Sequence, residues 1–83
     1  MITVKDAAAR AAEFARSLLE EGRVRDLLLE EVELSHEPPR WFITLSIPST
    51  DPLGLQRAYK TFTVDADTGT VLSMKIRELA SAP

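Results

Sequence analysis

Apolar residues change their spacing once along the chain, from a helical period to an alternating one. Residues 4–21 repeat them every three or four positions, which is typical of a helix with one buried face. Thr3 is the predicted N-cap, Asp6 occupies the capping-box position, and Gly22 follows the predicted helix end. The predicted buried stripe consists of Val4, Ala8, Ala11, Ala15, Leu18 and Leu19, with Ala7 and Phe14 beside it.

Residues 27–36 predict a first strand with an irregular start. Val32 and Leu34 alternate with polar residues, whereas the leucines at 27–29 do not keep that alternation. Three explanations stay open: the strand begins near Glu30, a bulge shifts its phase, or the leucines are covered on both sides. The segment 37–40 contains two prolines and predicts a break.

Three further strands follow. Residues 41–47 alternate cleanly, with Trp41, Ile43, Leu45 and Ile47 on one side, and residues 48–56 predict a loop. Residues 57–65 and 70–77 predict a hairpin around a tight turn at 66–69, in which Gly69 is free to adopt a positive φ. In the last strand, the predicted inward residues are Leu72, Met74 and Ile76, and the predicted outward residues are Val71, Ser73, Lys75 and Arg77.

This order predicts an α+β fold in one domain over residues 1–83: one N-terminal helix packed on a four-stranded antiparallel meander sheet (α-β-β-β-β). The sheet face away from the helix then carries a mixture of aromatic, apolar and hydroxyl side chains. Such a face is a plausible binding patch. The predicted partner-binding residues are Phe42, Thr44, Tyr59, Thr61 and Val71.

Composition narrows the function classes. The chain of 83 residues has a net charge of −3 and no cysteine, so thiolate metal sites and disulfides are excluded. The acidic balance argues against nucleic-acid binding, and the absence of a long apolar run argues against a membrane span. The N-terminal residues do not resemble a signal peptide, so a cytoplasmic location is expected. Because a core of this size gives only about 3–5 kcal/mol of stability, a partner protein or homodimer formation is expected to help.

The closing hairpin resembles that of PepSY-like domains, in which a strand leads into Asp-x-x-Thr-Gly-x-Val. The matching residues here are Asp65, Thr68, Gly69 and Val71, within the segment 62–72. The opening segment 2–7 and the strand beginning Trp41-Phe42-Ile43 are also similar to that family's layout. The resemblance implies an α+β fold and a role in peptidase inhibition or regulation. Members of the family are usually exported or membrane-attached, and this chain departs from them in showing no leader.

The residues that could act as metal ligands or catalytic groups are predicted to have structural roles. Counted from Asp65 as an EF-hand loop, glycine falls at position five and Ile76 at position twelve, so the calcium pattern fails and a turn is predicted. His36 is the only histidine, and it is predicted to be solvated or part of a turn. The acidic residues 30–33 with Glu37 predict a solvated edge, with docking of a basic partner as the alternative. We therefore expect no catalytic, cofactor-binding or metal-binding residues, and no enzyme activity.

The leading functional hypothesis is a small protein-interaction module that regulates or inhibits a partner through its open sheet face or an edge strand. The alternative is an antitoxin, an immunity-type protein or an accessory subunit from a bacterial defence or toxin operon. A third possibility, a small-molecule carrier, needs an unfilled core between helix and sheet, of which the patterned apolar faces give no sign.

Overall fold

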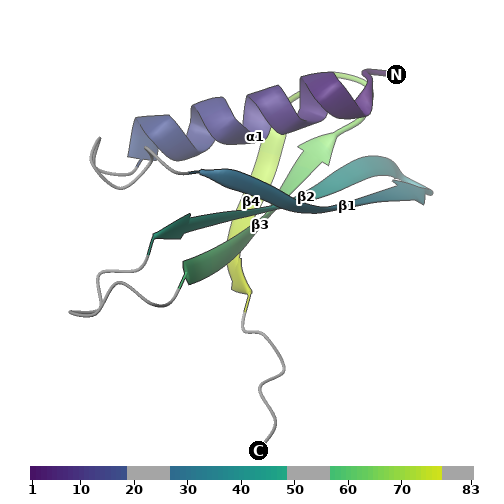
Figure 1. Cartoon of the computed structure of the whole chain (residues 1–83). Coiled ribbons are helices and arrows are strands. Elements are labelled where there is room, and N and C mark those ends of the chain that lie inside the picture. Colours follow the sequence, from purple (N-terminus) through teal and green to yellow (C-terminus); the bar gives the residue numbers. More distant parts are fainter. Residues whose placement is uncertain (19–26, 49–56, 78–83) are drawn as a thin grey trace, which may run out of the picture.

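The computed structural model describes residues 1–18, 27–48 and 57–77, which form one helix and four strands. These are α1 (Val4–Leu18), β1 (Leu28–His36), β2 (Pro39–Pro48), β3 (Arg57–Asp65) and β4 (Val71–Arg77). The sheet is antiparallel with the order β1-β2-β3-β4, and α1 lies across one of its faces (Figure 1). The predicted α+β meander is confirmed. Within the described part of the chain, no helix is both long enough and apolar enough to cross a bilayer.

The helix begins as its N-terminal sequence predicts, and the buried stripe is confirmed in its centre, at Ala11 and Ala15, but not at its ends. The amide of Asp6 donates to Thr3 Oγ1 at 3.1 Å, which confirms the N-cap. The fully buried helix residues are Ala7, Ala11 and Ala15, one row at four-residue spacing. Val4 and Leu18 were predicted in the stripe, but both are exposed. The helix turns its alanine row to the sheet because methyl side chains let the two backbones approach closely. Leu19 and Gly22 lie outside the described residues.

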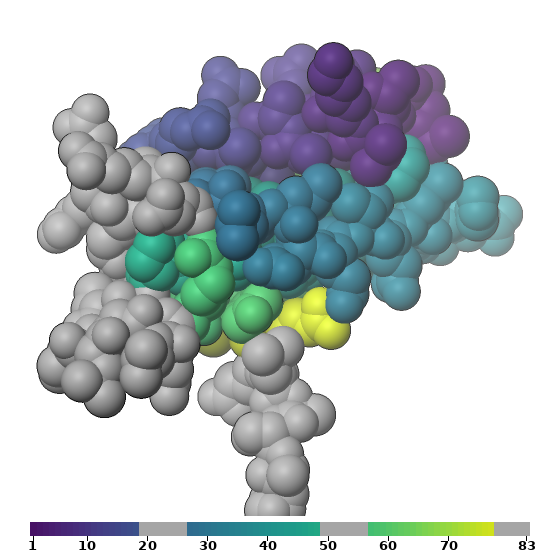
Figure 2. Space-filling view, viewed as in Figure 1, coloured from purple at the N-terminus to yellow at the C-terminus, as the bar shows by residue number. Residues whose placement is uncertain are grey.

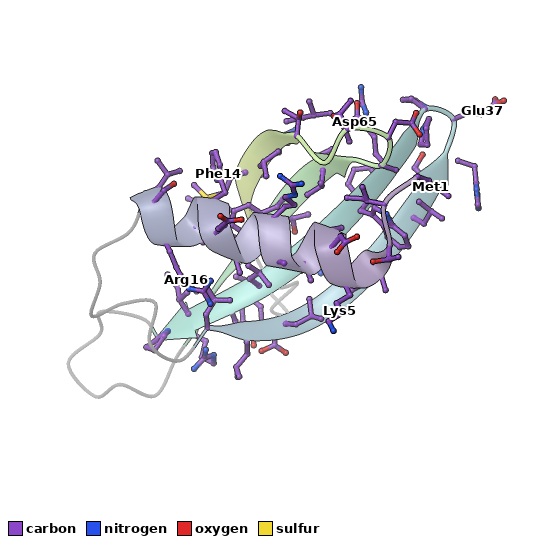
Figure 3. The ribbon with its side chains drawn as sticks, turned by 90° about the horizontal axis from the view of Figure 1, so that it is seen from above. Met1, Lys5, Phe14, Arg16, Glu37 and Asp65 are labelled. Carbon is purple, nitrogen blue, oxygen red and sulfur yellow. The ribbon has the colours of Figure 1, made fainter. Side chains whose placement is uncertain are left out.

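The core lies between this alanine row and the two central strands. Ile43 and Leu45 of β2 and Phe62 and Val64 of β3 are all buried. The ring of Phe14 meets the ring of Phe62 edge to face, with centroids 6.2 Å apart. Figure 3 shows Phe14 and Lys5 projecting to opposite sides of α1. The core is therefore centred on β2 and β3.

A β-bulge explains the irregular start of β1. Leu29 is opposite Leu45 and Glu31 is opposite Thr44, so Glu30 is the extra residue. Of the three explanations for the leucine run, the shifted phase is the observed one. Leu27 packs partly against the core, whereas Leu28 and Leu29 are about half exposed.

A second irregularity corrects the prediction for β4. Thr63 is opposite Ser73 and Val64 is opposite Val71, which leaves Leu72 as the additional residue. The shift turns Val71 to the helix side, where it packs against the core, so its predicted position on the open face is wrong. Met74 packs against the core as predicted, but Leu72 and Ile76 are exposed.

The start of the chain is fixed to one end of the sheet. The amide of Ile2 donates to the Ala66 carbonyl at 2.6 Å, and the indole nitrogen of Trp41 donates to the Ile2 carbonyl at 3.1 Å. Ala66 in turn donates to the carbonyl of Pro39 at 3.0 Å. Met1 consequently lies at the same end of the sheet as the two turns marked by Glu37 and Asp65 (Figure 3).

Candidate functional site

The open face of the sheet, opposite α1, is polar but its centre is not solvated. By register, Thr44 and Ser46 of β2 lie on this face, alternating with the core residues Ile43 and Leu45. They are nevertheless only 3% and 0% exposed. Buried hydroxyl groups need hydrogen-bond partners, and side chains from neighbouring strands provide them.

Thr44 belongs to a network that crosses all four strands. Its Oγ1 lies 3.0 Å from Oγ1 of Thr61 on β3 and 3.4 Å from Nη1 of Arg77, which donates to it. The same Nη1 donates to Oε1 of Glu31 at 2.7 Å, forming a salt bridge between β4 and β1. The hydrogen bond to Glu31, reinforced by the charge of that carboxylate, raises the pKa of Arg77 above its ordinary value. The side chains of Arg77 and Glu31 thus meet over the open face and link the two edge strands of the sheet.

Ser46 makes a second set of hydrogen bonds, nearer the C-terminal end of β2. Its hydroxyl donates to Oε2 of Glu30 at 2.6 Å and accepts from Nε of Arg57 at 2.8 Å. Arg57 also donates through Nη2 to the Ser46 carbonyl at 3.0 Å. The bulge that makes Glu30 the extra residue of β1 accompanies its contact with the open face.

A hollow of about 360 Å³ lies over the first network. It brings together three of the predicted partner-binding residues, Phe42, Thr44 and Thr61. Glu31 and Glu33 line it from β1, and Arg77 lines it from β4. Alternation along β1 and β4 indicates that these three charged residues face away from the core, but it does not show that they meet Phe42, Thr44 and Thr61.

The other two predicted residues lie elsewhere. Tyr59 is on the open face, because it is opposite Ser46 and Arg77, but it does not line the hollow. Val71 lines a separate hollow on the helix side, of about 430 Å³, together with Arg10, Glu13, Phe14, Gly69 and Thr70. The structure therefore gathers three of the five residues into one site.

The segment that begins at Asp65, which the EF-hand pattern does not fit, forms a turn. The Asp65 carboxylate accepts from the amides of Asp67 at 2.8 Å and Thr68 at 3.1 Å. The hydrogen bond from Thr68, and to a smaller extent that from Asp67, lowers the pKa of Asp65. The positive charge of Arg40 lowers it further. Gly69 has a φ of +79°, and a Cβ there would lie 3.3 Å from Nε of Arg10, so glycine suits both the backbone and the space.

His36 is exposed at the end of β1, in agreement with its predicted solvated position. Across residues 1–18, 27–48 and 57–77, no group of three or more histidine, cysteine or acidic side chains is arranged to hold a metal ion.

Comparison with protein-family models, with curated proteins and with solved structures found no match to this chain. The PepSY-like resemblance of the closing hairpin stays a prediction.

Proposed function

We propose that this chain is a non-catalytic protein-binding module that regulates or inhibits a partner protein through the open face of its sheet. The observation that carries the proposal is the hollow in which Phe42, Thr44 and Thr61 meet Glu31, Glu33 and Arg77. It combines an aromatic side chain, paired hydroxyls and charges of both signs on a single face.

The composition of this hollow suits a protein surface. Protein interfaces place aromatic residues and arginine at their centre and polar groups around them. Phe42 supplies an apolar contact that is only partly buried in the free chain. Hydrogen bonds to Glu31 and Thr44 position the Arg77 guanidinium over the hollow, where a partner can reach it.

Photo-crosslinking tests where the partner binds. A benzophenone amino acid replaces Phe42 in one variant and the exposed helix residue Ala9 in a matched control, and both are irradiated in extract from the native host. We expect one protein to be captured specifically through position 42. Its identity also separates the hypotheses, since a toxin or nuclease would favour the antitoxin or immunity role over the peptidase-regulating one.

The captured protein is then purified and its affinity measured by calorimetry. Thr61→Arg fills the hollow and is expected to weaken binding at least about tenfold, whereas Ala9→Arg leaves it unchanged. Capture only through position 9, or equal affinity for both variants, would contradict the proposal.

A further inference from the structure

The meander leaves a strand at each end of the sheet. Within the described residues, β1 pairs only with β2 and β4 pairs only with β3. Figure 2 shows β1 along the surface below α1, and Figure 1 shows β4 at the far side of the sheet. With four antiparallel strands, β1 and β4 run in opposite directions. If a second copy lay beside the first in the same orientation, its β4 would be antiparallel to β1, with both helices on the same side of a continued sheet.

The two faces of β1 differ in chemistry. By register, Glu31, Glu33 and Ser35 lie on the open face, opposite Thr44, Phe42 and Arg40 of β2. Val32 and Leu34 lie on the helix side, opposite Ile43 and Trp41. Val32 is 36% exposed, so this edge presents a row of acidic residues on one face and uncovered aliphatic surface on the other.

The two faces of β4 complement those of β1. Ser73, Lys75 and Arg77 lie on the open face, opposite Thr63, Thr61 and Tyr59 of β3. Met74 and Ile76 lie on the helix side, and Ile76 is 76% exposed. An isoleucine so exposed at a sheet edge, between two basic residues, marks a surface that another strand would cover.

We propose that β1 of one copy pairs antiparallel with β4 of a second copy, in the register that places Lys75 of the second copy opposite Glu33 and its Arg77 opposite Glu31. This register also places Ile76 of the second copy opposite Val32. The same register places Met74 opposite Leu34 and Ser73 opposite Ser35. Opposite charges and aliphatic pairs directly across from each other each stabilise an antiparallel pair.

Charge also selects against the symmetric alternatives. Two copies joined through β1 would place glutamates beside glutamates, and two joined through β4 would place Lys75 and Arg77 near their equivalents. Like charges directly opposite each other are destabilising. The acidic residues that prevent β1 from pairing with itself therefore match the basic edge of β4.

The internal salt bridge between Arg77 and Glu31 competes with this contact. Its side chains are 38% and 58% exposed, and exposed pairs of this kind contribute little. In the assembly Glu31 keeps an arginine partner, now from the second copy, and Glu33 gains Lys75. Because the two new pairs are near solvent, the association is expected to weaken as salt is added.

The contact is head to tail, so each assembly keeps one unpaired β1 and one unpaired β4. Such contacts extend with concentration unless they close into a ring. Sedimentation velocity of the full chain across a concentration series should show a weight-average mass that rises with concentration and falls with added sodium chloride. A wild-type chain that stays monomeric throughout would overturn the proposal.

Two charge-reversal variants test the pairing. Glu31→Lys with Glu33→Lys makes β1 basic, and Lys75→Glu with Arg77→Glu makes β4 acidic. Each variant alone is expected to be monomeric, and an equimolar mixture is expected to associate again. Persistent self-association of either variant, or no association in the mixture, would overturn head-to-tail pairing.

A single substitution at an exposed side chain tests the interface without disturbing the fold. Ile76→Ser changes a side chain that is already 76% exposed, and it should weaken association about tenfold or more by removing the contact with Val32. Leu18→Ser alters an exposed apolar residue that lies on α1 rather than on an edge strand, and it should leave association unchanged. Equal effects of the two variants would contradict the proposed interface. Because these assays need no other protein, their outcome is separate from that of the partner-binding experiment.

Discussion

The two faces of β2 are equally buried by different means. On the helix side, Ile43 and Leu45 are 0% and 3% exposed, and on the open side Ser46 and Thr44 are 0% and 3% exposed. Alanine residues of α1 and apolar residues of β3 close the first face. Hydrogen-bonded side chains from β1, β3 and β4 close the second. The centre of β2 is therefore shielded on its open face by side chains of the sheet itself, without a helix or a second sheet on that side.

The difference predicts how each face fails. The helix side depends on filled volume, so a cavity or an added methylene disturbs it. The open side depends on paired polar groups, so it is damaged when one member of a pair is removed and the other stays buried. Substitutions on each face, and a change of pH, therefore distinguish the two kinds of damage.

Phe62→Ala should have the largest effect. Phe62 is buried between β2, β4 and the ring of Phe14, and removing a buried phenylalanine costs about 3–5 kcal/mol. A loss of that size approaches the whole stability of a domain this small, so the variant should be largely unfolded by circular dichroism. Phe42→Ala, on the open face, is the control. If Phe42→Ala were unfolded to the same extent as Phe62→Ala by circular dichroism, the distinction between the faces would be wrong.

Ala11→Leu should destabilise the chain by overfilling the same face. Ala11 is 0% exposed where α1 meets the sheet, and overpacking typically costs about 1–3 kcal/mol in free energy of unfolding. The matched change Ala9→Leu lies on the exposed side of α1 and should stay within about 0.5 kcal/mol. Urea denaturation of both variants measures the difference, and a stabilising effect of Ala11→Leu would show that the helix is not held close to the sheet.

Thr61→Val should cost about 1–3 kcal/mol, because it leaves the hydroxyl of Thr44, which is only 3% exposed, without its partner on β3. The double variant Thr44→Val with Thr61→Val removes both hydroxyls of the pair. It should lose no more stability than the single variant, since no unpaired partner is left at that contact. Additive losses in a double-mutant cycle would mean that the two hydroxyls act independently.

Acid should produce the smallest effect, through Asp65. Its folded-state pKa is lowered from 3.8, so the unfolded state binds a proton more readily. The stabilisation is complete well above pH 3.8 and is lost as the pH falls through 3.8 toward the lowered folded value. Urea midpoints measured between neutral and strongly acidic pH should fall more for the wild type than for Asp65→Asn. Parallel curves would show that the turn amides do not stabilise the charged form.

Sequence patterns predicted the elements whose side chains follow one period. The alternation of Trp41, Ile43 and Leu45 placed β2 correctly, and Thr3 with Asp6 located the helix start. Patterns failed where a bulge changed the phase, since one extra residue puts the side chains before it and after it out of step. Val71 was therefore assigned to the wrong face, although Met74, beyond the bulge, was placed correctly.

The candidate site was predicted only in part for a different reason. Phe42, Thr44 and Thr61 lie on adjacent strands, so alternation alone placed them together. Glu31 and Arg77 lie on opposite edges of the sheet, and their contact depends on how the sheet twists and where each side chain reaches. Sequence periodicity carries neither of those quantities.

Trp41 makes the attachment of the N-terminal residues to the sheet visible by fluorescence. It is the only tryptophan, and its indole donates to the carbonyl of Ile2, whose amide in turn donates to Ala66. Intrinsic fluorescence excited at the tryptophan band therefore originates at one place, where residues 1–3 meet the end of the sheet. The chain carries its own unlabelled reporter of that attachment, readable in stopped-flow experiments and distinct from the backbone signals of the helix and strands.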